Sequence, residues 1–185
     1  MQVRELGLGV VEIVPKRFGD ARGYFAETWQ RQRFRDLGID HDWVQDNQSL
    51  SPEPYVLRGL HFQRAPMPQA KLVRVLRGAI FDVVLDIRPG SADFGRWVSC
   101  ELSAVAFNQL YVPEGFAHGF LTLEPDTEVL YKVSAPYAPE CERSIAWNDP
   151  ALAIAWPLRE GQQPLLSAKD AVAARLEAMT SDLVF

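Results

Sequence analysis

The chain has 185 residues, enough for one domain with a substantial core. Its net charge of −5 argues against a nucleic-acid binder, and no apolar run reaches the about 18 residues of a membrane span. Because the N-terminus also lacks an apolar secretory signal, we expect a cytoplasmic protein. Cys100 and Cys141 are too few for a disulfide framework and are expected to be buried, inert thiols.

Short strands dominate the first three quarters of the chain. One helix is expected before them, from Glu27 to Leu37, with Gly38 as its C-terminal stop. Two β-branched runs then flank Arg77-Gly78, a pattern that predicts a hairpin of strands 72–76 and 79–86. Further strands, separated by Pro, Gly and Asp turns, are expected at 97–102, 109–112, 119–123 and 127–133. Many short strands spaced by turns predict an all-β sandwich or barrel.

The last part of the chain is expected to cover this sandwich. Residues 147–157 form an extended, proline-punctuated stretch. A second helix, over about 168–180, follows Ser167, and Val172, Leu176 and Met179 recur at helical spacing. Ser167 with Asp170 three residues later also fits a capping box.

Three histidines are the first candidates for chemistry. His41 lies in the polar run Asp-His-Asp and is expected at the surface. His61 and His118 lie in apolar strand-like segments, where each could equally be a satisfied structural histidine. The segment Pro-x-Gly-x-x-His ending at His118 is typical of the second metal-binding cupin motif, but Thr122 replaces its asparagine. His61 is not followed by the second histidine of the first motif. Two separated histidines do not supply the three ligands of a mononuclear site, so no metal is predicted.

Acid–base catalysis without metal is the other hypothesis. Imidazole titrates near neutrality, so His61 or His118 could take a proton from a carbon that a neighbouring ketone acidifies. The resulting enolate oxygen needs a positive partner, for which Lys71 is a candidate, although it could also be a solvated strand end. Tyr131 could return a proton from the opposite face, or be a core aromatic with a bonded hydroxyl.

An ordered series of motifs runs along nearly the whole chain, from about residue 3 to residue 170. Its members are Asp20–Glu27 (DARGYFAE), Gln45–Ser51 (QDNQSLS), Leu57–Gln63 (LRGLHFQ), Lys71–Val75 (KLVRV), Gly115–Phe120 (GFAHGF), Tyr131–Lys132 and Ile145–Pro150 (IAWNDP). Together they resemble the dTDP-4-dehydrorhamnose 3,5-epimerase family. Departures are small: Pro54-Tyr55 stands where the family commonly has glycine, and Phe62 where tyrosine is frequent.

The resemblance implies a cupin jelly-roll barrel with a few short peripheral helices, formed by residues 1–185 as one domain. It also implies a homodimer in which an N-terminal arm, within about residues 1–50, is shared with the partner. The expected reaction converts dTDP-4-dehydro-6-deoxy-D-glucose to dTDP-4-dehydro-L-rhamnose for dTDP-L-rhamnose biosynthesis, and it needs no cofactor.

The same resemblance assigns roles to individual residues. His61 is the general base, Asp170 its orienting carboxylate, Tyr131 the acid that reprotonates carbon, and Lys71 the partner of the enolate. The remaining residues are implied in substrate binding: Arg58 and His118 at the sugar and phosphate, Arg22 at the pyrophosphate, Phe25, Glu27, Gln45 and Asn47 at the nucleotide or sugar, Tyr137 stacked on thymine, and Glu142 and Lys169 as further contacts. The spacing alone allows Asp170 to be a helix cap instead of, or as well as, the partner of His61.

Alternatives remain open at this point. A 3- or 5-mono-epimerase, or a ketoisomerase on a related dTDP-4-keto-6-deoxy sugar, would share most of these residues. A non-catalytic sugar-nucleotide-binding cupin and a metal-dependent cupin are the alternatives from other classes.

Overall fold

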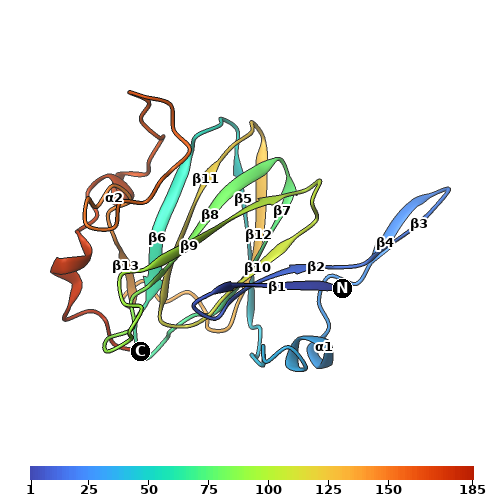
Figure 1. Ribbon diagram of the computed structural model, residues 1–185, viewed down its shortest axis with the longest axis horizontal. Coiled ribbons are helices and arrows are strands. Elements are labelled where there is room, and N and C mark those ends of the chain that lie inside the picture. Colours follow the sequence, from blue (N-terminus) through green and yellow to red (C-terminus); the bar gives the residue numbers. More distant parts are fainter.

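Two antiparallel sheets face each other in the computed structural model, which describes residues 1–185 (Figure 1). The first sheet contains, in spatial order, β1 (Gln2–Gly7), β2 (Val10–Val14), β10 (Gln109–Val112), β7 (Lys71–Arg77), β12 (Thr127–Val133) and β5 (Gln45–Ser51). The second contains β13 (Glu142–Ser144), β6 (Leu57–Gln63), β11 (Phe116–Thr122), β8 (Ala79–Asp86) and β9 (Trp97–Ser103). This jelly roll confirms the predicted all-β cupin fold.

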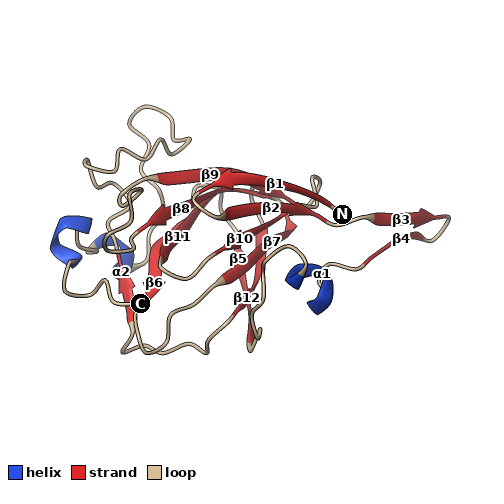
Figure 2. Cartoon of the chain, turned by 60° about the horizontal axis from the view of Figure 1, so that its bottom comes forward, coloured by secondary structure: helices blue, strands red, loops and turns tan.

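A separate hairpin leaves the body of the sandwich. It consists of β3 (Arg17–Asp20) and β4 (Gly23–Ala26), and it extends away from both sheets (Figures 1 and 2). In the remainder of the first 50 residues, β1, β2 and β5 belong to the first sheet.

The predicted hairpin around Gly78 is wrong, although both of its strands exist. β7 belongs to the first sheet and β8 to the second, so the two strands do not pair. Gly78 has φ +75° and packs directly on Thr127, which leaves no room for a side chain. The glycine therefore turns the chain from one sheet to the other, a corner that local sequence does not distinguish from a hairpin turn.

The two predicted helices are shorter than expected. Helix α1 spans Arg31–Arg35, because the extended Gln30 caps it, and the chain then turns at Gly38 (φ +79°) as predicted. In place of one helix over 168–180, the structure has α2 (Ala168–Ala171) and a 3₁₀ turn, η1 (Leu176–Met179). Backbone hydrogen bonding of Ala174 to Ala146 interrupts the helix between them.

Apolar clusters fill one part of the interior and cover the outside of the second sheet. Leu176 and Met179 pack on that outer face as predicted, whereas Val172 is 81% exposed. Inside the sandwich, the core includes Val73, Val75 and Val129 from the first sheet and further side chains from the second. No helix is long and apolar enough to cross a membrane. The part of the interior that this core leaves open holds the candidate site.

Candidate active site

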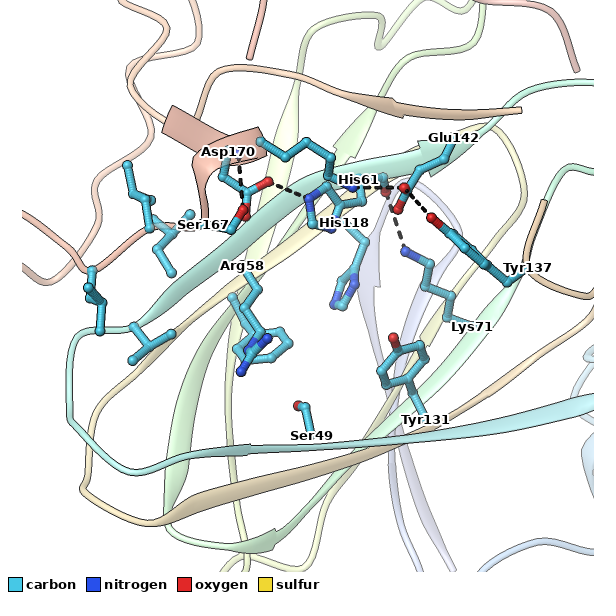
Figure 3. A pocket seen from close by; sticks show the side chains of 16 residues that line it. Ser49, Arg58, His61, Lys71, His118, Tyr131, Tyr137, Glu142, Ser167 and Asp170 are labelled. Carbon is cyan, nitrogen blue, oxygen red and sulfur yellow. Dashed lines mark hydrogen bonds and ion pairs between the residues drawn. The ribbon is translucent and has the colours of Figure 1, made fainter. Parts of the chain in front are cut away.

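A cavity of about 510 Å³ opens between the two sheets, beside the segment 165–170 of the C-terminal cover. A second lobe of about 270 Å³ adjoins it and shares His61, Lys71, Tyr131, Tyr137 and Glu142 with the first. The polar side chains around the first lobe come from both sheets and the C-terminal segment (Figure 3): Ser49, Arg58, His61, Lys71, His118, Tyr131, Tyr137, Glu142, Ser167, Lys169 and Asp170. Residues far apart in the sequence, from Ser49 to Asp170, therefore meet at one site.

A bulge in β6 explains how both Arg58 and His61 reach this cavity. Residues three apart on a regular strand face opposite sides of the sheet. Here His61 pairs with His118 and Arg58 pairs with Phe120, so three steps on β6 match two on β11. Gly59, at φ +125°, absorbs the extra residue and lies against the backbone of His118 and Gly119, where a Cβ would clash. Such bulges redirect side chains.

The His61–Asp170 pair lies at the cavity wall. Nε2 of His61 is 2.6 Å from Oδ1 of Asp170, and the His61 side chain is 25% exposed against 3% for Asp170. Burial, the largest single effect, acts to raise the pKa of Asp170, but the hydrogen bond and charge of His61, with smaller effects of Ser167 and Lys169, together lower it. An ionised carboxylate can only accept, so Nε2 carries the proton and Nδ1 keeps the free lone pair of a base.

Ser167 caps α2 as its spacing with Asp170 predicted, through the backbone amide of Asp170. The Asp170 amide donates to Oγ of Ser167 at 3.1 Å, which caps α2. One short helical turn therefore fixes the backbone of Asp170, while its carboxylate bonds to His61.

Lys71 and Tyr131 come from the first sheet, opposite His61. Lys71 is 8% exposed and its Nζ donates to the carbonyl of His61 at 3.3 Å, so it is not a solvated strand end. Burial lowers the pKa of Lys71 to about 8, against an opposing effect of Asp82. The hydroxyl of Tyr131 points into the cavity and is free of any hydrogen bond within the chain, whereas a core tyrosine would have a partner (Figure 3). Burial raises its pKa, which keeps the phenol protonated.

A second His–Asp pair lies deeper, and its acidic member was missed by sequence reasoning. His118 lines the cavity, with Nε2 2.9 Å from Oδ2 of Asp82. Both are buried; burial lowers the pKa of His118 and raises that of Asp82. Asp82 lies between Ile80 and Val84 on an apolar strand, and a lone carboxylate there was the signal that could have found it.

Most of the predicted substrate-binding residues line one lobe or the other. Glu142 accepts hydrogen bonds from Lys169 Nζ at 2.8 Å and from the Tyr137 hydroxyl at 2.9 Å. Gln45 and Asn47 line the second lobe and bond to each other at 2.7 Å. Arg58 donates to the carbonyl of Leu50 and to Ser51, which aims its guanidinium along the first lobe.

The hairpin residues lie elsewhere. Arg22, Phe25 and Glu27 line neither lobe. Arg22 pairs with Asp20 at the hairpin turn, Phe25 is 71% exposed, and Glu27 pairs with Arg33. This chain alone therefore does not bring its predicted pyrophosphate-binding arginine to the cavity.

His41 and the cysteines complete the sequence candidates. The surface prediction for His41 is wrong: the ring is half-buried against Trp43, and its Nε2 lies 2.8 Å from the Tyr111 hydroxyl. Cys100 and Cys141 are free and buried, as predicted.

No three His, Cys, Asp or Glu side chains lie close enough together to hold a metal ion. The donor set of a mononuclear metal site is thus missing, while a histidine base, its carboxylate, a lysine and a free phenol surround one cavity. These features place the protein among cupin-type enzymes equipped for acid–base chemistry.

Comparison with known proteins gives the family. A family model described as dTDP-4-dehydrorhamnose 3,5-epimerase matches residues 8–178. The chain is 52% identical over 169 residues to the dTDP-4-dehydrorhamnose 3,5-epimerase of Salmonella typhimurium, which covers 91% of each protein. The chain belongs to the dTDP-4-dehydrorhamnose 3,5-epimerase family.

Solved structures agree with this assignment. The epimerase of Mycobacterium tuberculosis superposes with a TM-score of 0.94 at 45% identity, covering 100% of this chain and 93% of that one. The dTDP-6-deoxy-D-glucose-3,5-epimerase of Legionella pneumophila, solved with dTDP-4-keto-L-rhamnose, gives 0.89 at 47% identity, covering 95% and 92%.

Proposed function

We propose that this chain is a 3,5-epimerase that converts dTDP-4-dehydro-6-deoxy-D-glucose to dTDP-4-dehydro-L-rhamnose in dTDP-L-rhamnose biosynthesis. The observation that carries the proposal is the arrangement of His61 with Asp170 across one cavity from Lys71 and Tyr131. The Legionella relative, bound to a dTDP-4-keto sugar, supports the same substrate class.

The reaction needs only proton transfer. The C4 ketone acidifies the hydrogens on carbons 3 and 5, and His61 removes one of them through Nδ1. The negative charge moves to the ketone oxygen, where the ammonium of Lys71 stabilises it. Tyr131 then protonates the carbon from the opposite face, which inverts the centre. Asp170 keeps the proton on Nε2 and stabilises the imidazolium that forms. His61 then releases its proton to solvent and Tyr131 regains one from solvent, and because no electrons leave the substrate the cycle balances without a redox cofactor.

The remaining side chains of the cavity bind the sugar and the nucleotide. Arg58 and His118 hold the sugar and phosphate, and Tyr137 stacks on thymine beside Glu142 and Lys169. Gln45 and Asn47 complete this part from the second lobe.

We further propose that the enzyme is a cytoplasmic homodimer in which the hairpin of one subunit reaches the cavity of the other. The proposal is supported by the position of Arg22, Phe25 and Glu27, which lie outside the cavity of their own chain. A partner's arginine would supply the bidentate pyrophosphate contact.

Incubation with dTDP-4-dehydro-6-deoxyglucose in heavy water tests the function, with NMR locating the deuterium. Deuterium at both carbon 3 and carbon 5, with inversion, is expected. Label at one carbon only would identify a mono-epimerase, and absence of exchange would refute the proposed chemistry.

A further inference from the structure

The segment 135–138 carries Tyr137 to the cavity, yet no strand or helix holds it. Its two carbonyls at Ala135 and Pro136 and its two amides at Tyr137 and Ala138 make no hydrogen bond to another backbone group. The Tyr137 side chain is also 53% exposed, so packing does not fix it. A stretch of this kind is ordinarily among the least ordered parts of a protein.

Gln63 forms hydrogen bonds with two of these four backbone groups. Its Nε2 donates to the carbonyl of Pro136 at 3.2 Å, and its Oε1 accepts from the amide of Ala138 at 2.8 Å. The same Nε2 donates to the carbonyl of Met67 at 2.8 Å. Gln63 is 4% exposed and its bond from the Ala138 amide is buried, so its loss would leave that buried amide unpaired.

Two further glutamines form hydrogen bonds with the other two backbone groups. Nε2 of Gln69 donates to the carbonyl of Ala135 at 2.6 Å, and Oε1 of Gln45 accepts from the amide of Tyr137 at 3.0 Å. The ring end of Tyr137 is held as well, because its hydroxyl donates to Glu142. We call Gln45, Gln63 and Gln69 the glutamine clamp.

We propose that Gln63 is a positioning residue for nucleotide binding, which acts by fixing the segment 135–138 so that the Tyr137 ring stands in place before the nucleotide arrives. Ordering a loop during binding costs affinity, and a loop ordered beforehand avoids that cost. The proposal rests on the proposed function, since it takes thymine as the ligand of Tyr137.

Gln63 lines the second lobe, and its hydrogen-bond partners separate binding from chemistry. It lies on β6 two residues after His61, but its three hydrogen bonds all go to backbone groups, and none goes to a side chain of the proposed proton transfer. Its loss should therefore raise KM and leave kcat nearly unchanged.

The test compares Gln63→Leu with Gln109→Leu. Gln109 is a matched control, since it is 2% exposed, donates to the backbone carbonyl of Thr28 at 2.8 Å and lines neither lobe. Gln63→Leu should raise the KM for the dTDP-4-keto sugar and the Kd of dTDP about tenfold, with kcat within about twofold. Gln109→Leu should destabilise the fold without changing either constant.

Two additional variants make the result specific. If Gln63 acts through Tyr137, then Gln63→Leu should not weaken dTDP binding further in a Tyr137→Ala background. Gln69→Leu removes one bond of the clamp and should produce a smaller rise in the Kd of dTDP, which retains the test if Gln63→Leu does not fold.

Amide hydrogen exchange in the ligand-free protein provides a readout that is independent of activity. The amides of Tyr137 and Ala138 should exchange faster in Gln63→Leu than in wild type. Faster exchange with an unchanged Kd of dTDP, or equal losses of affinity in Gln63→Leu and Gln109→Leu, would overturn the proposal. Wild-type protein that neither binds dTDP nor exchanges substrate hydrogens would refute the proposed function instead, whatever the clamp variants do to amide exchange.

Discussion

The two His–Asp pairs of the cavity have nearly the same geometry and opposite surroundings. His61 and His118 are direct neighbours across β6 and β11, and their distances to Asp170 and Asp82 are 2.6 and 2.9 Å. The His61 side chain is 25% exposed, against 6% for His118. Burial acts to raise the pKa of both carboxyls, but the combined effects of His61, Ser167 and Lys169 lower that of Asp170, whereas the pKa of Asp82 stays raised.

The contrast shows that a His–Asp hydrogen bond does not by itself define a catalytic pair. A base must gain and lose a charge during each turnover. Exposure to solvent permits this change of charge, whereas burial disfavours the charged form. Burial lowers the pKa of His118, which favours a neutral ring suited to hydrogen bonding with the sugar. The open pair is therefore assigned to proton transfer and the closed pair to binding.

The largest expected effect is that of His61→Ala. Exchange of the substrate hydrogens should fall about 10³-fold, because a general base contributes about 10² to 10⁴ in rate. The free energy of unfolding should also fall, because the substitution leaves the buried Asp170 without its hydrogen-bond partner. His118→Ala, measured alongside, should lower the free energy of unfolding by about 1–3 kcal/mol, because it leaves the buried Asp82 without its hydrogen-bond partner. Full activity of His61→Ala would contradict the assignment of proton transfer to the His61–Asp170 pair.

Asp170→Asn should come next, with a loss of about 10² in kcat. The amide leaves the Ser167 cap intact, because that bond uses the backbone of Asp170, but it cannot stabilise an imidazolium. Steady-state rates with a circular dichroism control would measure this. An unchanged kcat would mean that Asp170 serves only as a cap.

Tyr131→Phe separates the two halves of the reaction. Proton removal by His61 does not require the phenol, so deuterium exchange should persist while inversion falls about tenfold more than exchange. NMR measures both in one sample. Equal losses of exchange and inversion would remove Tyr131 from its role as the acid.

The pH profile tests how Asp82, the acidic member of the buried pair, influences the pKa of Lys71. Lys71 must be protonated to stabilise an enolate, and its pKa is about 8, so kcat should fall as the pH rises through about 8. The charge of Asp82 raises this pKa against burial. Asp82→Asn should therefore move the alkaline limb to lower pH. A limb that stays in place would show that Asp82 carries no charge in the folded protein.

The smallest expected effect is that of a chelator. The cavity lacks a metal-binding set of side chains, so EDTA should leave the rate unchanged. Strong inhibition that zinc or another divalent ion reverses would revive the metal-dependent alternative.

Local sequence signals predicted the strands β7 to β12, but they did not predict β1 to β5 or β13, and they gave the wrong partners for β7 and β8. The bounds of β10 and β12 follow from apolar runs between turns, but the separation of β7 from β8 depends on which sheet each joins. No local pattern around Gly78 carries that information. Similarly, the continuous C-terminal helix fails because Ala174 bonds to a segment far away in the sequence.

In the candidate site, too, the sequence predicted some residues and not the contacts that depend on the fold. Motifs predicted His61, Lys71 and Tyr131, each of which lines the cavity. The glutamine clamp was not predicted, because its members are scattered and their partners are backbone groups. Such contacts depend on the folded geometry, and the residue types alone do not indicate them.

The pairing of His61 with Asp170 spans 109 positions of sequence, and this distance has a consequence for the newly made chain. The last sheet strand, β13, ends at Ser144, so both sheets can assemble before the segment with Asp170 has left the ribosome. At that stage His61 has no carboxylate beside it. His61 therefore gains its carboxylate late, when the C-terminal segment docks on the assembled sheets.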